Sequence, residues 1–179
     1  MTNDVLYVWL RLRYLSEFSA NQSDDTIDRC FFSDKVDFLE RRIIALQHSE
    51  RLYQSNAVAF ITAFLNAALI YIYEELRDCP RWTNVCICLS QRIQSGLQLV
   101  DLSSIINDCP DLLLWTLLLG RSGVSPLGGL SGPWYEEEIS SVVDGNDGIR
   151  VPPVVRKPLL YYALAEQARR PSTPKLEPQ

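Results

Sequence analysis

Nine consecutive residues decide the fold class of this chain: Asp111-Leu-Leu-Leu-Trp-Thr-Leu-Leu-Leu119. Only Asp111 and Thr116 are polar, so a helix built from this stretch has no face suited to water. The segment therefore predicts the most buried helix of a globular domain, with Trp115 in its core. Asp108 and Cys109-Pro110 mark a break before it, because proline disfavours helical geometry in the preceding residue.

Apolar side chains at intervals of three and four residues predict further helices on both sides of this stretch. Ser33 is predicted to be an N-cap, followed by the stripe of Val36, Leu39, Ile43 and Leu46. We also expect helices over 5–18, 56–77, 82–100, 131–143 and 159–169, and loops over 21–28, 120–129 and 144–148.

No segment shows the sustained two-residue alternation of a strand. The predicted fold is all-α, an irregular bundle of about six to eight helices. It is expected to form a single domain over residues 1–170. The last residues, 171–179, carry three prolines and are expected to form a disordered tail.

Composition argues against nucleic acid and membrane as direct partners. The chain is 47% hydrophobic and carries a formal net charge of -5, which opposes contact with phosphate. The stretch from Leu52 to Tyr73 has no charged residue and approaches the length of a membrane span. However, Asn66 lies near its centre, where lipid would leave the amide unpaired. We therefore predict a buried helix of a soluble bundle.

The cysteines and the single histidine do not form a metal-site pattern. Cys86-Ile-Cys88 lacks the second ligand pair of a zinc module, and on a helix its two thiols point about 200° apart. With Asp4 in place of a basic start, no signal peptide is evident, and we expect free thiols in a reducing compartment. His48, the only histidine, is expected at the surface.

Three other segments that resemble functional motifs have simpler explanations. Glu136, Glu137 and Glu138 follow a predicted helix start, where acidic residues favour the helix dipole. The glycine-rich stretch after Leu119 lacks the lysine of a phosphate loop. The L-x-x-L-L pattern that begins at Leu114 is expected to be core. We predict no catalytic, cofactor-binding or metal-binding residue, no cofactor and no enzymatic activity.

Four segments together resemble the regulatory domain of fungal zinc-cluster transcription factors. They are Ile70–Pro80 (IYIYEELRDCP), Leu102-Ser-Ser104, Pro110–Gly120 (PDLLLWTLLLG) and Gly132–Glu136 (GPWYE). In that family an apolar "LLLW" helix ends in a glycine-containing loop, and an aromatic pair opens the next helix. The order and spacing match over residues 56–143.

The resemblance implies a helical domain that modulates activation, mediates dimerisation or senses an effector. It places the chain in the nucleus, with the cytoplasm as the alternative. The expected partner is a transcription factor or a second copy of the chain, and a small effector is the further option. The family's zinc cluster and basic linker are missing here, so we expect a fragment or a stand-alone protein without direct DNA contact. The alternatives are an interaction module with no transcriptional role and, third, an uncharacterised helical enzyme.

Overall fold

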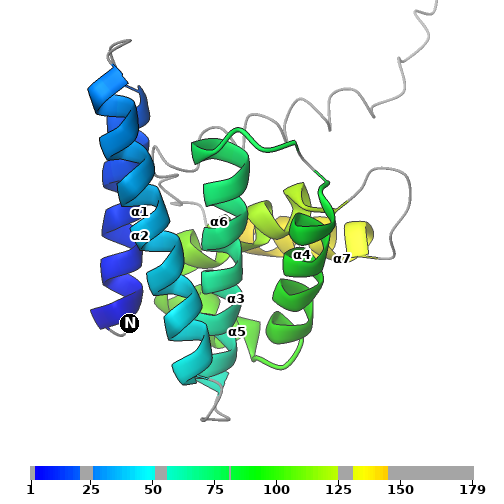
Figure 1. Ribbon diagram of the computed structural model, residues 1–179. Helices are drawn as coiled ribbons and strands as arrows, with labels where there is room; N and C mark the ends of the chain where they lie inside the picture. The colour runs from blue at the N-terminus through cyan, green and yellow to red at the C-terminus, as the bar shows by residue number, and fades with distance from the viewer. Residues whose placement is uncertain (1–2, 21–25, 51–55, 81, 125–130, 145–179) are drawn as a thin grey trace, which may run out of the picture.

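The computed structural model of the chain describes residues 3–20, 26–50, 56–80, 82–124 and 131–144 (Figure 1). Within these ranges it contains seven α-helices, one π-helical turn and no strand. The elements are α1 (Asn3–Ala20), α2 (Thr26–Glu50), α3 (Asn56–Tyr71), the π-helical turn η1 (Ile72–Leu76), α4 (Asn84–Leu97), α5 (Leu102–Asp108), α6 (Pro110–Ser122) and α7 (Ser131–Asp144). The predicted all-α bundle is confirmed. The predicted helix over 159–169 and tail over 171–179 lie outside the described residues, as does the end of the predicted domain at residue 170.

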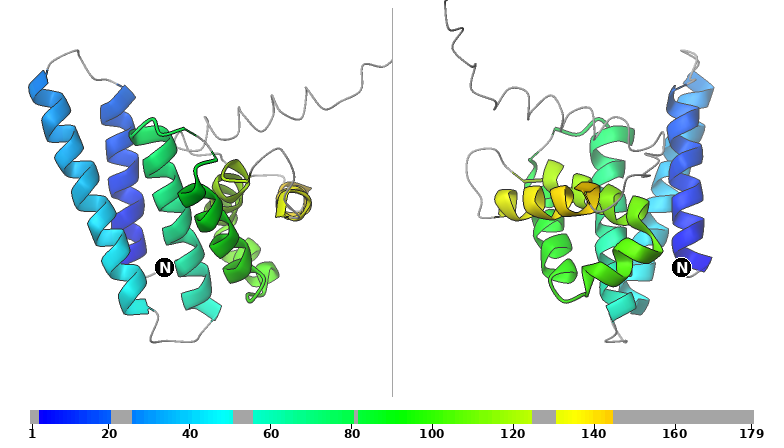
Figure 2. Two further views of the ribbon diagram at one scale, coloured as in Figure 1. Left: turned by 45° about the vertical axis from the view of Figure 1, so that its right-hand side comes forward. Right: turned by 180° about the vertical axis from the view of Figure 1, so that it is seen from behind.

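The helices form layers around α3 (Figure 2). The antiparallel pair α1 and α2 lies on one side of the molecule, and α3 packs between this pair and α4. α6 packs on both α3 and α4, and α7 covers α6 on the side away from α1 and α2. The short helix α5 lies against α6.

Trp115 lies at the centre of the bundle and is fully buried, as the sequence predicts. Its ring centroid lies 5.2 Å from that of Trp9, 5.5 Å from that of Phe64 and 5.9 Å from that of Tyr71. Every residue from Leu112 to Gly120 is buried, so the L-x-x-L-L pattern belongs to the core. Each of the three rings comes from α1 or α3, and Trp115 therefore joins α6 to both helices.

Ala57–Leu76 is long and apolar enough to cross a membrane by length and composition alone. A core helix passes the same test, and 61% of this window is buried inside the structure. Asn66, which is only 2% exposed, accepts a hydrogen bond from Gln47 Nε2 at 3.1 Å and donates to the Thr62 carbonyl at 2.8 Å. The buried amide is therefore satisfied by protein, which favours the predicted packing of this helix in a bundle.

The predicted N-cap at Ser33 is wrong, because α2 already begins at Thr26. The predicted loop over 21–28 accordingly ends earlier, and its residues 21–25 lie outside the described ranges. Phe32 supplies the physical reason. It is half-buried and stacks on Phe18 of α1, with ring centroids 5.8 Å apart. The contact between Phe32 and Phe18 stabilises the longer helix. It outweighs the preference of Ser33 for the first position of a helix.

The predicted loop over 120–129 begins too early, because α6 continues through Gly120 to Ser122. Ser122 Oγ donates to the Leu119 carbonyl at 2.8 Å and satisfies one of the last acceptors of the helix. Gly120 stays helical because its missing side chain makes room for a ring of α7. Residues 125–130 lie outside the described ranges.

Two other predicted helices divide differently from the prediction. The helix over 82–100 is α4, which starts after the N-cap Thr83 and ends at Leu97, so Val100 lies beyond it. A separate helix, α5, follows with Asp101 as its N-cap. The helix over 56–77 ends in the π-helical turn, where Tyr73 Oη donates to Glu40 at 2.7 Å and Arg77 pairs with Asp37 at 2.6 Å. These contacts tie the turn to α2.

Candidate functional site

The cysteine pair of α4 and the single histidine do not form a metal site in the described structure. Cys86 and Cys88 both belong to α4, but Cys86 is buried and Cys88 is exposed, as their helical spacing predicts. His48 is exposed near the end of α2. Within the described ranges, no three His, Cys, Asp or Glu residues come together as a metal site would require.

The glutamates of α7 have separate surroundings. Glu136 Oε1 accepts hydrogen bonds from Arg121 Nη2 at 2.8 Å and from Arg121 Nε at 3.1 Å. Both side chains are partly buried, so the pair fastens α7 to the end of α6. Glu137 is exposed, whereas partial burial and then the neighbouring Glu137 charge raise the pKa of Glu138. Glu136 thus serves the packing of α7 on α6, while Glu137 and Glu138 interact through their charges.

Two of the segments that carry the family resemblance, 110–120 and 132–136, pack against each other. The fully buried Tyr135 donates its hydroxyl to the Ser90 carbonyl at 2.7 Å. Ser90 Oγ in turn donates to the Gly120 carbonyl at 2.6 Å. Trp134 lies edge-on to Tyr135, with ring centroids 4.8 Å apart. The glycine of α6 and the aromatic pair of α7 therefore hold α4, α6 and α7 together.

A cavity of about 710 Å³ is lined by Val5 near the start of α1 and by Ala57 and Phe60 near the start of α3. Figure 1 shows that α1 and α3 begin at the same end of the bundle. We call this cavity the end cavity. Its walls are mostly apolar and include Phe60, Ile61 and Phe64 of α3, Ile105 of α5 and Leu112 of α6. Ligand sites in proteins are typically concave, mostly apolar and of this size.

A few polar groups line the end cavity beside these apolar walls. They are Asp101, Ser104, Asp108 and Cys109. Burial and then the charge of Asp108 raise the pKa of the Cys109 thiol. A thiol with a raised pKa is mostly protonated at neutral pH and is a poor nucleophile. Cys109 is therefore not activated as a nucleophile in this cavity.

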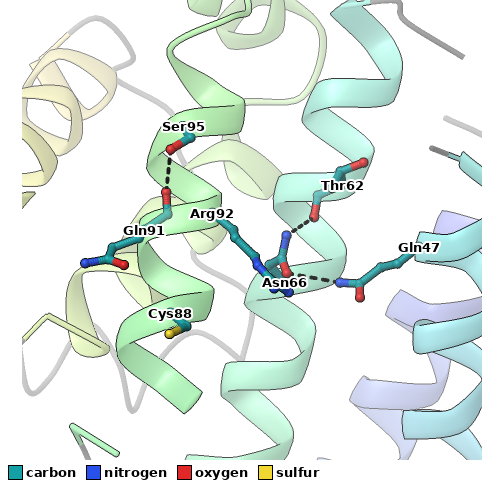
Figure 3. A pocket seen from close by; sticks show the side chains of 7 residues that line it. All are labelled: Gln47, Thr62, Asn66, Cys88, Gln91, Arg92 and Ser95. Atoms are coloured by element: carbon teal, nitrogen blue, oxygen red, sulfur yellow. Dashed lines mark hydrogen bonds between the residues drawn. The ribbon is translucent and has the colours of Figure 1, made fainter. Parts of the chain in front are cut away.

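A second, shallower pocket of about 440 Å³ lies between α2, α3 and α4 (Figure 3). Asn66 forms its floor and bonds to Gln47 and to the Thr62 carbonyl, while Arg92 extends toward it from α4. Cys88, Gln91 and Ser95 complete the wall. We call it the polar pocket. Its buried amide is already satisfied, so the pocket presents mainly the exposed guanidinium of Arg92.

Large apolar side chains lie exposed on α1 and α2, beside charged residues such as the Arg13–Glu17 pair. In α1, Val5, Val8, Leu12 and Leu15 are buried, and Leu6, Leu10 and Tyr14 follow the opposite side at intervals of four residues. In α2, Phe31 and Phe38 are also exposed. We call these five residues, which are each 41% to 61% exposed, the outer face.

The two aromatic residues of α2 lie along its edge toward α1. Phe31 lies near Phe18 of α1, with ring centroids 6.4 Å apart. Arg42 pairs with Asp4 of α1 at 2.9 Å. Phe38 falls between Phe31 and Arg42 at helical intervals of seven and four residues, so it shares their side of α2. Phe31 and Phe38 therefore lie on the side of α2 next to α1, where Lys35 Nζ lies 4.7 Å from the centre of the Phe31 ring and the Arg42–Asp4 pair bridges the two helices.

The end cavity, the polar pocket and the outer face are not apparent in the sequence patterns. One local signal was present, because Asp101 before Leu102-Ser-Ser104 is typical of a helix start and would have indicated α5, which forms one wall of the end cavity. Comparison of the chain with family models, with curated proteins and with solved structures finds no match.

Proposed function

We propose that this chain is a regulatory helical domain of the kind found in fungal zinc-cluster transcription factors. It acts through a protein partner or a small effector, without contacting DNA itself and without enzymatic activity. Its expected location is the nucleus, with the cytoplasm as the alternative. The proposal starts from the resemblance over residues 56–143. The packing of Gly120 against Tyr135 supports it, because it brings together the glycine and the aromatic pair on which the resemblance rests.

The observation that carries the proposal is the outer face. Five large apolar side chains of the outer face remain exposed on two neighbouring helices. Exposed apolar side chains that gather on one side of a protein are a feature of protein interaction sites. A partner that offers an apolar helix surface would cover it, as helices do in bundles. A second copy of the chain offers such a surface, and a transcription factor is the partner that the resemblance implies.

A reporter assay tests the proposal. The chain is fused to a heterologous DNA-binding domain, and transcription is compared for the parent, Leu10→Glu and Phe38→Glu. Because each variant places a charge on the outer face, we expect the effect of the chain on the reporter to be lost. Leu99→Glu is the matched control, since Leu99 is 75% exposed but lies beyond α4, on a different surface. Unchanged reporter activity in folded Leu10→Glu and Phe38→Glu variants would contradict the proposal.

The same assay separates the regulatory role from a general interaction module. If the chain is an interaction module with no transcriptional role, the parent fusion will leave the reporter unchanged. The Leu10→Glu variant will still lose binding to the partner.

The lack of direct DNA contact is tested on the purified chain. The net charge of -5 opposes phosphate binding, and Cys86 and Cys88 point apart. We expect no stoichiometric zinc by metal analysis and no sequence-dependent DNA binding in a salt titration. Stoichiometric zinc, or tight specific binding at physiological salt, would restore a direct role at DNA.

A further inference from the structure

The end cavity has walls that are set by the core. Phe64 is fully buried, and Phe60 and Leu112 are less than a tenth exposed. Phe64 also packs against Trp115, with ring centroids 5.5 Å apart. These side chains cannot rotate to fill the cavity without disturbing the centre of the bundle, because protein interiors are close-packed. The cavity is therefore preformed, and a ligand would enter it at little cost in reorganisation.

The charged side chains among the described residues that line the end cavity are both acidic. Asp101 and Asp108 lie at the two ends of α5, and both line the cavity. One oxygen of Asp101 accepts a hydrogen bond from the backbone nitrogen of Ser103 at 3.1 Å. No lysine or arginine is among the described residues that line the cavity. The site thus offers apolar walls together with negative charge.

From this combination we infer that the end cavity binds a small apolar molecule that carries a protonated amine. The apolar body lies against Phe60, Phe64 and Leu112, and the ammonium group lies at α5, close to Asp101 and Asp108. An anionic ligand would be repelled by both carboxylates, and a neutral one would leave their charge unused. The inference deepens the proposed function by naming the class of its effector.

Three probes with the same apolar body test this inference on the purified chain. Adamantanamine, adamantanol and adamantanecarboxylate differ only in a cationic, neutral or anionic group. Isothermal titration calorimetry should show that the amine binds about threefold or more tightly than the alcohol, since partly exposed ion pairs contribute up to about that factor each. The carboxylate should bind most weakly. Equal affinities, or tightest binding of the carboxylate, would overturn the charge preference.

Substitutions locate the site. Asp101→Asn and Asp108→Asn each remove one charge and should weaken amine binding about threefold, with no loss for the alcohol. Asparagine is as good an N-cap as aspartate, so Asp101→Asn preserves the start of α5. Ser104→Phe places a ring in the cavity and should block all three probes. Ser103→Phe, one position away and outside the lining, is the matched control.

The outcomes distinguish this inference from the proposed function. Absence of binding by all three probes, or amine binding that none of the cavity substitutions changes, would overturn the end cavity as the site. If circular dichroism shows that Ser104→Phe does not fold, Asp101→Asn and Asp108→Asn still test whether the amine binds in the end cavity. Calorimetry measures binding without transcription, whereas the reporter variants Leu10→Glu and Phe38→Glu leave the cavity intact. A failure of one therefore does not imply a failure of the other.

Discussion

Gly120 lies inside α6 with its α-carbon directed at the ring of Tyr135. A β-carbon added at this position would lie 2.5 Å from Cε1 and Oη of Tyr135 and 2.6 Å from Cζ. These separations are far inside the contact distance of two heavy atoms. The ring has no room to retreat, because Tyr135 is fully buried and its hydroxyl is held by the Ser90 carbonyl.

Two opposing terms set the effect of Gly120→Ala on the free energy of unfolding. Alanine in a helix interior is favoured over glycine by about 1 kcal/mol. Overpacking a core costs about 1–3 kcal/mol, and full expulsion of an aromatic ring costs about 3–5 kcal/mol. Because the added β-carbon would clash with three atoms of Tyr135, the steric cost is near the top of the overpacking range or within the range for ring expulsion. We therefore expect a net loss of about 2–4 kcal/mol.

Gly96→Ala is the matched control. A β-carbon at Gly96 in α4 would lie 3.4 Å from the Ala59 carbonyl oxygen and 3.6 Å from the Ala63 β-carbon, which are ordinary contacts. Only the helix preference remains, so we expect no loss and a gain of up to about 1 kcal/mol. The pair compares the same chemical change in two helices with and without a clash.

Urea unfolding followed by far-UV circular dichroism measures both variants. A double-mutant cycle with Tyr135→Leu identifies the contact, because the penalty of Gly120→Ala should shrink once the ring is absent. If Gly120→Ala were as stable as Gly96→Ala, or if its penalty persisted in the Tyr135→Leu background, the contact between α6 and α7 would not be as described.

Three further predictions concern the core, the pH dependence and the thiols. Trp115→Ala should lose about 3–5 kcal/mol in urea unfolding. Trp115→Phe should lose less stability, because in the described structure Trp115 Nε1 has no hydrogen-bond partner that the substitution would remove. An unchanged urea midpoint in Trp115→Ala would show that Trp115 is exposed. Burial and then the bond to Glu40 raise the pKa of Tyr73 from 10.0 to about 12. The folded state therefore holds this proton more tightly, and stability that is complete below pH 10.0 is lost as the pH rises toward about 12. Tyr73→Phe should therefore make the free energy of unfolding fall less steeply with pH. The pKa values of Tyr71 and Tyr135, raised mainly by burial, should account for part of the fall that remains. An identical dependence of stability on pH in parent and variant would refute the role of Tyr73. Iodoacetamide followed by mass spectrometry should label the exposed Cys30 and Cys88 in the folded chain and Cys86 only after denaturation, because Cys86 is buried and desolvation raises the pKa of its thiol. Equal labelling of Cys86 and Cys88 would contradict their opposite placement on α4.

Local pattern was sufficient for the all-α fold class and for much of the core. The stretch around Trp115 has no polar face, so any compact fold must bury it. The stripe of Val36, Leu39, Ile43 and Leu46 is buried as its spacing predicts. The break at Cys109-Pro110 follows from the geometry of proline, which needs no distant partner. Each of these features depends only on residues that are neighbours in sequence.

Tertiary structure decided the features that depend on distant partners. α2 begins before Ser33 because Phe32 meets Phe18 of another helix, and Gly120 stays helical because Tyr135 occupies its open side. In α1, Leu6 and Leu10 are as apolar as the buried Leu12 and Leu15, so hydropathy cannot tell which side faces α3. The end cavity exists because α3, α5 and α6 meet at their ends without filling the space between them. Packing between separate helices, which periodicity within one helix does not encode, therefore positions both the outer face and the end cavity.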